Sequence, residues 1–148
     1  MSRAVIIDSN VAIKLFVQED LSDRAQAIMA RLTSSEAHDM FEVYAPDIMW
    51  AECANVLWKY VSFYNYSLDD AQADLHNLFL LAITPVPIGE ALEADAFRLA
   101  CTYGVAVYDA FYLALAQNLG GVLITADQKL LKRTGDGLPA VYLGDWLL

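Results

Sequence analysis

Two short, uninterrupted apolar runs, one near each end of the chain, constrain the fold more than any other feature. Residues 4–7 are apolar and lead directly to Asp8, and residues 122–125 lead to Asp127 after one intervening residue. A strand that is apolar on both faces is typical of a parallel sheet, because helices cover both sides of such a sheet. The two runs therefore predict buried parallel strands that each end close to an acid.

The sequence between these runs alternates between helical and strand-like segments. Helices are expected over residues 11–16, 21–32, 47–64, 90–103, 109–119 and 127–132, with a further helix after the N-cap Ser67. Shorter strands are expected over residues 43–45, 84–87 and 140–143. Strands that alternate with helical crossovers predict one domain over residues 1–148, of fold class α/β: a three-layer α/β/α sandwich with a central, mainly parallel sheet.

Composition and charge limit the classes of protein to consider. Hydrophobic residues make up 57% of the chain, and the apolar stretch at residues 78–83 is too short to cross a bilayer. The first residues resemble a strand and not a signal peptide. Cys53 and Cys101 lie in apolar helical patterns and are interpreted as buried free thiols, although a disulfide is not ruled out by spacing. We expect a cytoplasmic protein that makes no membrane contact.

The net charge of −10, with only nine Lys and Arg residues, argues against tight, metal-free binding of a nucleic acid. The objection is weaker if several of the acids hold divalent cations, since these would place positive charge where a phosphate must lie.

Four acids are the candidates for such a cation site. Asp8 and Asp127 follow predicted strands, and ligands of parallel sheets bind beyond the carboxyl ends of the strands. Asp109 is expected to open a helix at the same edge. Glu52 shares a narrow polar strip of the helix over residues 47–64 with Asn55 and Lys59. The other side of this helix carries an apolar stripe: Met49, Cys53, Val56, Tyr60 and Phe63.

A carboxylate cluster repels itself unless cations are present or some groups are protonated. Carboxylate oxygens select Mg²⁺, Mn²⁺ or Ca²⁺ over Zn²⁺, and the two histidines, His38 and His76, lack ligand spacing. Magnesium-class ions suit phosphodiester hydrolysis. No phosphate loop, dinucleotide-binding glycine motif or nucleophilic Ser-His or Cys-His arrangement is present.

Each of these acids also has a simpler interpretation. Asp109 and Asp127 would both stabilise a helix N-terminus, and a glutamate on a long helix is usually solvated. The group formed by Tyr108, Phe111, Tyr112 and Leu115 is more typical of a core than of a base-stacking surface. Spacing alone thus indicates an acidic metal site and leaves RNA as one of several substrates.

Four motifs in order resemble those of the PIN-domain family, which includes the VapC-type toxin ribonucleases of toxin–antitoxin pairs. They are VIIDSN at residues 5–10, AECANVL at 51–57, YDAFYLALA at 108–116 and LITADQKLL at 123–131. The resemblance implies a PIN-like α/β sandwich and Mg²⁺- or Mn²⁺-dependent endoribonuclease activity. It assigns Asp8, Glu52, Asp109 and Asp127 to the metal site, and it implies that Ser9, Asn10 and Thr125 support those ligands. It also implies a homodimer and a small antitoxin partner.

The resulting hypothesis is that Asp8, Asp109 and Asp127 ligate one ion, while Glu52 helps to hold a second ion or orients the attacking water. Candidate RNA contacts are the basic residues nearest the motifs: Lys14, Lys59, Lys129, Lys132 and Arg133. The alternatives are a non-catalytic scaffold of the same fold, a PIN nuclease outside a toxin–antitoxin pair, and a DNA nuclease. A haloacid-dehalogenase-like phosphatase is disfavoured, because that family has a second aspartate where this chain has Asn10.

Overall fold

A single sheet of parallel strands lies at the centre of the molecule. In the computed structural model, which describes residues 2–37 and 39–146, the strands are β1 (Arg3–Ile7), β2 (Phe41–Pro46), β3 (Thr84–Val86), β4 (Val122–Thr125) and β5 (Ala140–Tyr142). Their order is β3-β2-β1-β4-β5, and every pair of neighbours is parallel. Val5 on β1 lies opposite Val43 on one side and Val122 on the other. The apolar runs therefore form β1 and β4, which are adjacent parallel strands inside the sheet, and the prediction of buried parallel strands is confirmed.

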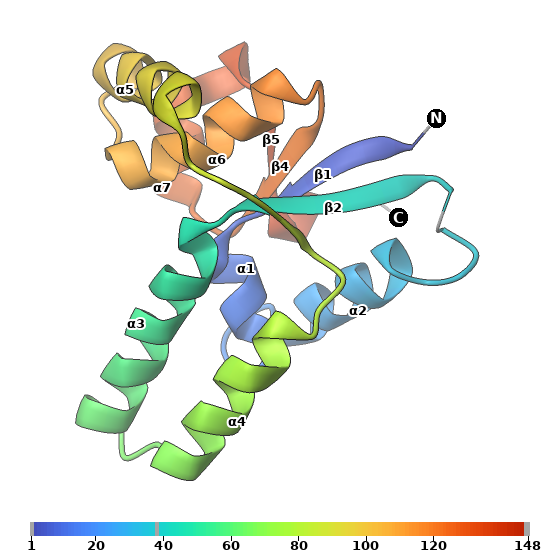
Figure 1. Cartoon of the computed structure of the whole chain (residues 1–148), viewed down its shortest axis with the longest axis vertical. Helices are drawn as coiled ribbons and strands as arrows, with labels where there is room; N and C mark the ends of the chain where they lie inside the picture. The colour runs from blue at the N-terminus through green and yellow to red at the C-terminus, as the bar shows by residue number, and fades with distance from the viewer. Residues whose placement is uncertain (1, 38, 147–148) are drawn as a thin grey trace.

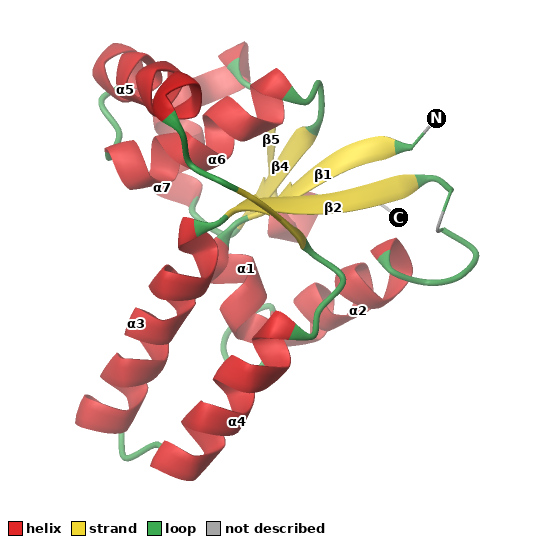
Figure 2. Ribbon diagram, in the orientation of Figure 1, coloured by secondary structure: helices red, strands yellow, loops and turns green. Residues whose placement is uncertain are grey.

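Helices cover both faces of the sheet. They are α1 (Ser9–Ala12), α2 (Ser22–Leu32), α3 (Ile48–Phe63), α4 (Leu68–Phe79), α5 (Glu90–Tyr103), α6 (Val107–Asn118) and α7 (Gln128–Thr134), and short 3-10 turns lie at Ile13–Leu15, Gly135–Gly137 and Leu143–Asp145. Helices α1 to α4 lie on one side of the sheet and α5 to α7 on the other (Figures 1 and 2). This arrangement confirms the predicted α/β/α sandwich, and the hydrophobic core lies along both faces of β1 and β4.

The strand order places a topological switch at the carboxyl ends of β1 and β4. From β1 the chain moves outward through β2 to β3 by way of α1 to α4, and then returns to the other side of β1 to form β4 and β5. Right-handed crossovers in opposite directions put their helices on opposite faces of a sheet. The crevice at such a reversal is the usual ligand site of an open α/β sheet. Asp8 follows β1 and Asp127 follows β4, so both lie at this point.

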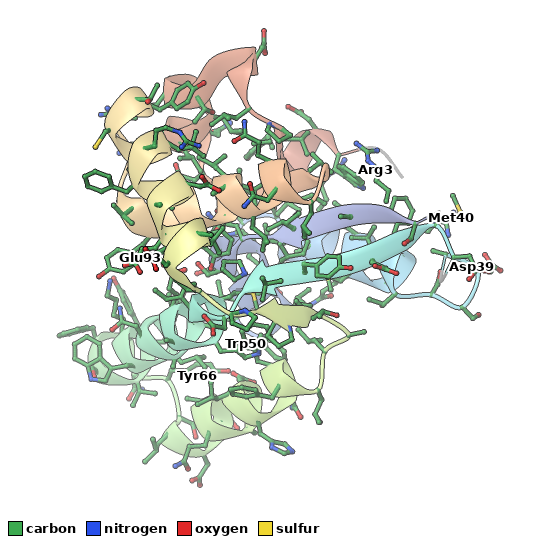
Figure 3. All side chains as sticks on the ribbon, turned by 45° about the horizontal axis from the view of Figure 1, so that its top comes forward. Arg3, Asp39, Met40, Trp50, Tyr66 and Glu93 are labelled. Carbon is green, nitrogen blue, oxygen red and sulfur yellow. The ribbon has the colours of Figure 1, made fainter. Side chains whose placement is uncertain are left out.

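Helices α3 and α4 form an antiparallel hairpin that extends away from the sheet (Figure 1). The predicted N-cap Ser67 begins α4, where its hydroxyl oxygen accepts a hydrogen bond from the Asp70 backbone at 3.3 Å. Near the sheet, the rings of Trp50 and Phe79 stack with their centroids 6.0 Å apart. At the connection, Tyr66 donates a hydrogen bond of 2.5 Å to Asp74 (Figure 3). These contacts fix the hairpin that carries Glu52 and Asn55.

Some details of the predicted burial are wrong. Cys53 is buried, but Cys101 is exposed, since it lies one residue beyond the buried Leu99 and Ala100 and turns away from the sheet. Both thiols are free. On α3 the apolar stripe ends early, because Phe63 extends past the sheet and is 68% exposed. The short helix predicted over residues 11–16 begins at Ser9 and continues as a 3-10 turn.

The C-terminal turn is held against the start of the chain. The Arg3 guanidinium, labelled in Figure 3, lies over the Trp146 ring, 5.4 Å from its centroid. Arg24 donates hydrogen bonds of 2.8 Å and 2.5 Å to the carbonyls of Leu143 and Trp146.

Over residues 2–37 and 39–146, no single helix is long and apolar enough to span a membrane. Helices α5 and α6 pass that test of length and composition only as a pair, and the pair is bent by 113°.

Two glycines end α6 and allow β4 to pack against β1. Gly120 is left-handed, with φ of 60°, and the backbone N–H groups of Gly120 and Gly121 donate to the carbonyls of Gln117 and Ala116. A Cβ atom at Gly121 would lie 2.4 Å from the Ala4 carbonyl oxygen. The backbone of two adjacent strands thus requires glycine at this position.

We expect Gly121→Ala to lower the free energy of unfolding by about 1–3 kcal/mol, because the added methyl group must push β1 and β4 apart. Gly89→Ala is the matched control. Gly89 has extended backbone and no atom within 4 Å of its would-be Cβ, so alanine meets no clash there and loses only the N-cap preference for glycine, which is worth at most about 1 kcal/mol. Urea unfolding followed by circular dichroism measures both. Equal effects of the two substitutions would contradict this account of the β1–β4 contact.

Candidate functional site

Asp8 is a buried carboxylate at the carboxyl end of the central strand. Only 3% of the residue is exposed. One carboxylate oxygen accepts a hydrogen bond of 2.7 Å from the Thr125 hydroxyl, and the other lies 3.4 Å from the Ser9 hydroxyl. The backbone also fixes its position, because the Asp8 N–H donates to the Ile124 carbonyl on β4. The acid is therefore held by two adjacent strands.

A small polar network connects the ends of β1 and β4. The Asn10 side chain donates to the Thr125 hydroxyl oxygen at 3.3 Å and accepts from the Ala126 N–H at 3.0 Å. Thr125 also accepts from the Asp127 backbone N–H at 3.1 Å. Asn10 and Thr125 thus set the path of the chain from β4 to Asp127.

Glu52 approaches the same place from α3. Tyr112 on α6 donates a hydrogen bond of 2.6 Å to its carboxylate, across 60 residues of sequence. Burial raises the pKa of Glu52 first, and the charge of Asp109 raises it further, while hydrogen bonds from Tyr112 and Ser9 oppose the shift. The Tyr112 hydroxyl remains protonated, because burial and the neighbouring acids raise its pKa far above the usual value. Glu52 is therefore held in place by a permanent donor.

Asp109 and Asp127 lie at the beginnings of α6 and α7. Asp109 is in the first turn of α6, and burial followed by the charge of Asp127 raises its pKa. Asp127 is the N-cap of α7, where its carboxylate accepts from the Leu130 N–H at 3.0 Å. The simpler interpretation as helix-terminal acids is thus correct for Asp127. It does not exclude a second role, because one carboxylate oxygen remains.

The acids form one electrostatic group. Burial raises the pKa of Asp8 to about 7, against a partly opposing hydrogen bond from Thr125, and the charges of Asp109 and Glu52 raise it further. Asp109 in turn feels the charge of Asp127. A chain of repulsion therefore links all four acids that the sequence singled out.

The donor atoms suit a hard divalent cation. Cys53 lies beside the acids, but its thiol donates to the Ser9 carbonyl, and burial raises its pKa to about 12, so it remains protonated and a poor metal ligand. His76 is exposed on α4, and His38 lies outside the described residues. The described side chains around the acids therefore provide oxygen ligands, as magnesium-class ions require.

The carboxylates are not already gathered around one point. In the part of the chain that the structure describes, no three Asp, Glu, His or Cys side chains are arranged as a ready-made metal site. Protein donors occupy Asp8, Glu52 and Asp127 individually. Cation binding would compete with these hydrogen bonds.

Two pockets flank the acids and differ in chemistry. A pocket of about 360 Å³ is lined by Ser9, Glu52, Asn55 and Tyr108, with apolar walls from α3. A second, of about 170 Å³, is lined by Asp109, Asp127, Lys129 and Arg133.

Sequence reasoning missed two aromatic residues. Tyr112 was expected in the core, where it is, but its hydrogen bond to Glu52 was not foreseen. Tyr108 was expected in the core and is 60% exposed, because in the first turn of α6 it borders a pocket shared with α3. No signal in an apolar stripe distinguishes a covered turn from an uncovered one.

Comparisons with known proteins agree with this architecture. The PIN domain model matches residues 5–136. Ribonuclease VapC3 of Pyrobaculum aerophilum is 34% identical over 131 residues, which cover 87% of this chain and 93% of the relative.

Two solved structures have the same fold at 19% identity. PAE2754 from Pyrobaculum aerophilum has a TM-score of 0.70 and covers 96% of this chain and 85% of its own. A toxin–antitoxin complex from Klebsiella pneumoniae has a TM-score of 0.68, with coverage of 94% and 97%.

The raised pKa of Asp8 predicts how stability depends on pH in metal-free protein. Because the folded pKa of about 7 exceeds the ordinary value of 3.8, the folded state binds more protons between these limits. The free energy of unfolding should therefore fall as pH rises from about 4 to about 7, by roughly a few kcal/mol at most. Asp8→Asn should weaken this dependence and be more stable than the parent at pH above 7.

Urea unfolding in chelator, at a series of pH values, measures this effect. Asp136→Asn, at an exposed turn, is the control that should keep the parental slope. If Asp8→Asn were less stable than the parent above pH 7, the carboxylate would not be under the repulsion described here.

Proposed function

The chain belongs to the PIN-domain family, and from this membership we propose that it is a VapC-type ribonuclease that hydrolyses RNA phosphodiester bonds at Asp8, Glu52, Asp109 and Asp127. One observation carries the assignment of the site: Asp8 is buried at the switch point between β1 and β4 and shares its electrostatic environment with Glu52 and Asp109. Buried acids that repel one another are concentrated at functional sites, because they lower the stability of a fold that does not use them.

Mg²⁺ or Mn²⁺ is the proposed cofactor. Asp8, Asp109 and Asp127 would hold one ion, and Glu52 would help to hold a second or would orient the attacking water. When bound, divalent cations supply positive charge for the phosphate and make water a better nucleophile. They would also relieve the repulsion that raises the pKa of Asp8.

Side chains of the protein would accept the proton of the attacking water and hold the substrate. Glu52 is half-buried, faces the larger pocket and has a raised pKa, so its carboxylate is suited to take a proton from the attacking water. Tyr112 holds this carboxylate in orientation. Hydrogen bonds of Thr125 and Asn10 fix the position of Asp8 relative to the start of α7. Lys129 and Arg133 lie beside Asp109 and Asp127, where they can neutralise the phosphates next to the scissile bond.

Protein partners are a further part of the proposal. The similar structure from Klebsiella pneumoniae is a toxin–antitoxin complex. By analogy, we propose a small antitoxin with a basic segment as the partner of this acidic chain, and a homodimer as its assembly. Large exposed apolar side chains on the α3–α4 hairpin support protein contacts of this kind. They are Trp58, Phe63, Tyr64, Leu68, Phe79 and Leu80.

Asp8→Asn should reduce cleavage of single-stranded RNA in Mn²⁺ by at least about 100-fold while the protein remains folded, because one of the proposed ligands is lost. Asp136→Asn should cleave like the parent. Initial rates on defined RNAs, with a chelator arm and a parallel single-stranded DNA arm, measure the effect. Cleavage by Asp8→Asn at the parental rate would refute the mechanism. A parent that binds Mn²⁺ but cleaves neither nucleic acid would point to a scaffold.

Lys129→Ala should raise KM for RNA and reduce the slope of log KM against log salt by about 0.7, the value expected when one phosphate contact to a single strand is lost. Lys132→Ala is the comparison, because Lys132 is exposed on the same helix but lines a different pocket with Tyr142 and Asp145, so this candidate from the sequence should keep the parental slope. A parental slope for Lys129→Ala would place the RNA away from Asp109 and Asp127.

A further inference from the structure

Tyr108 and Asn55 line one pocket, about one helical turn from the hydrogen bond that joins Tyr112 to Glu52. Tyr112 on α6 reaches Glu52 on α3 with a hydrogen bond of 2.6 Å. One turn toward the N-terminus of α6 lies Tyr108, and three residues along α3 from Glu52 lies Asn55. Tyr108 and Asn55 do not form a corresponding hydrogen bond; both line a pocket of about 360 Å³.

Two polar groups on the walls of this pocket, the Tyr108 hydroxyl and the Asn55 amide, have no hydrogen-bond partner among the described residues. Tyr108 is 60% exposed, and its nearest aromatic neighbour, Phe111, lies at a tilted 6.5 Å between ring centroids. Among residues 2–37 and 39–146, none forms a hydrogen bond with the Tyr108 hydroxyl or the Asn55 amide. An exposed ring and a free amide on opposite walls form a typical recognition pair for a flat polar ring.

The remaining walls of the pocket disfavour a negatively charged ligand. Ile48, Ala51 and Val56 contribute apolar surface, and among the described lining residues the only charged side chain is the Glu52 carboxylate. Such a pocket repels a phosphate and accepts an uncharged aromatic group. The basic side chains lie in the other pocket, with Asp109 and Asp127. A substrate that passes over the acids therefore meets apolar surface on one side and positive charge on the other.

We propose that this pocket binds one unstacked nucleobase of the RNA, with Tyr108 as the stacking surface and Asn55 as the hydrogen-bonding group at the base edge. The proposal rests on the ribonuclease function proposed above and names how its substrate is held. A base inside a duplex cannot enter such a pocket, so the enzyme should prefer single-stranded RNA. Stacking tolerates any base, whereas the Asn55 amide would discriminate among bases.

Steady-state kinetics on a short single-stranded RNA in Mn²⁺ tests the pocket. Tyr108→Ala should raise KM about 5- to 100-fold with little change in kcat, since stacking on an aromatic side chain contributes about 1–3 kcal/mol per base. Tyr108→Phe should restore the parental KM. Phe97→Ala is the control, because Phe97 is 62% exposed on α5 and lines neither pocket beside the acids. Asn55→Ala should change the ranking of the four bases at one position.

RNAs with a single abasic nucleotide identify the base that occupies the pocket. One position should exist at which removal of the base raises the KM of the parent as much as Tyr108→Ala does. With the RNA that is abasic at that position, Tyr108→Ala should have the same KM as the parent. If Tyr108 had a purely structural role, Tyr108→Ala would raise KM by the same factor for every RNA, abasic or intact.

The outcomes separate this proposal from the nuclease function. If the parent cleaves RNA and Tyr108→Ala has an unchanged KM, the base pocket is refuted alone, and the pocket is left for a side chain of a protein partner. If the parent cleaves nothing but binds the RNA in fluorescence anisotropy with a Tyr108-dependent affinity, the nuclease is refuted and the pocket stands. If the parent neither binds nor cleaves RNA, both are refuted.

Discussion

The hydrogen bond from Thr125 to the buried Asp8 carboxylate is the interaction on which the site depends. It joins the ends of the two central strands, at 2.7 Å, where the sheet changes direction. Burial of a charge near other acids costs stability, and the bond offsets only part of that cost. The fold therefore maintains a region of unbalanced negative charge at its switch point, and cations are the natural means of balancing it.

Most of the fold could be predicted from the sequence because its signals are local. The apolar runs before Asp8 and Asp127 form β1 and β4, and Ser67 caps the start of α4 as expected. Burial was harder to predict, since periodicity shows which residues share a face but not how far a neighbour covers that face. Cys101 is exposed for that reason.

The four candidate acids could be singled out from the sequence, but the contacts that hold them could not. Asp8 stands out because it ends an apolar strand, whereas Glu52, Asp109 and Asp127 needed the family resemblance to be preferred over ordinary helix acids. The hydrogen bond of Tyr112 to Glu52 joins residues 60 apart, and no local pattern encodes such a pairing. Tyr108 illustrates the same limit, because it shares a face of α6 with the fully buried Tyr112 yet lies at an open pocket.

The two pockets explain how a chain of net charge −10 can act on RNA. A protein that relies on its own basic residues needs many phosphate contacts, and this chain has nine Lys and Arg in total. Three kinds of contact would share the binding of RNA. Cations would attract the scissile phosphate, and Lys129 and Arg133 would bind the neighbouring phosphates. Tyr108 would add base stacking, which depends little on salt. The acidity that opposes direct binding of a nucleic acid would then serve that binding, because the acids would hold the cations that supply the positive charge.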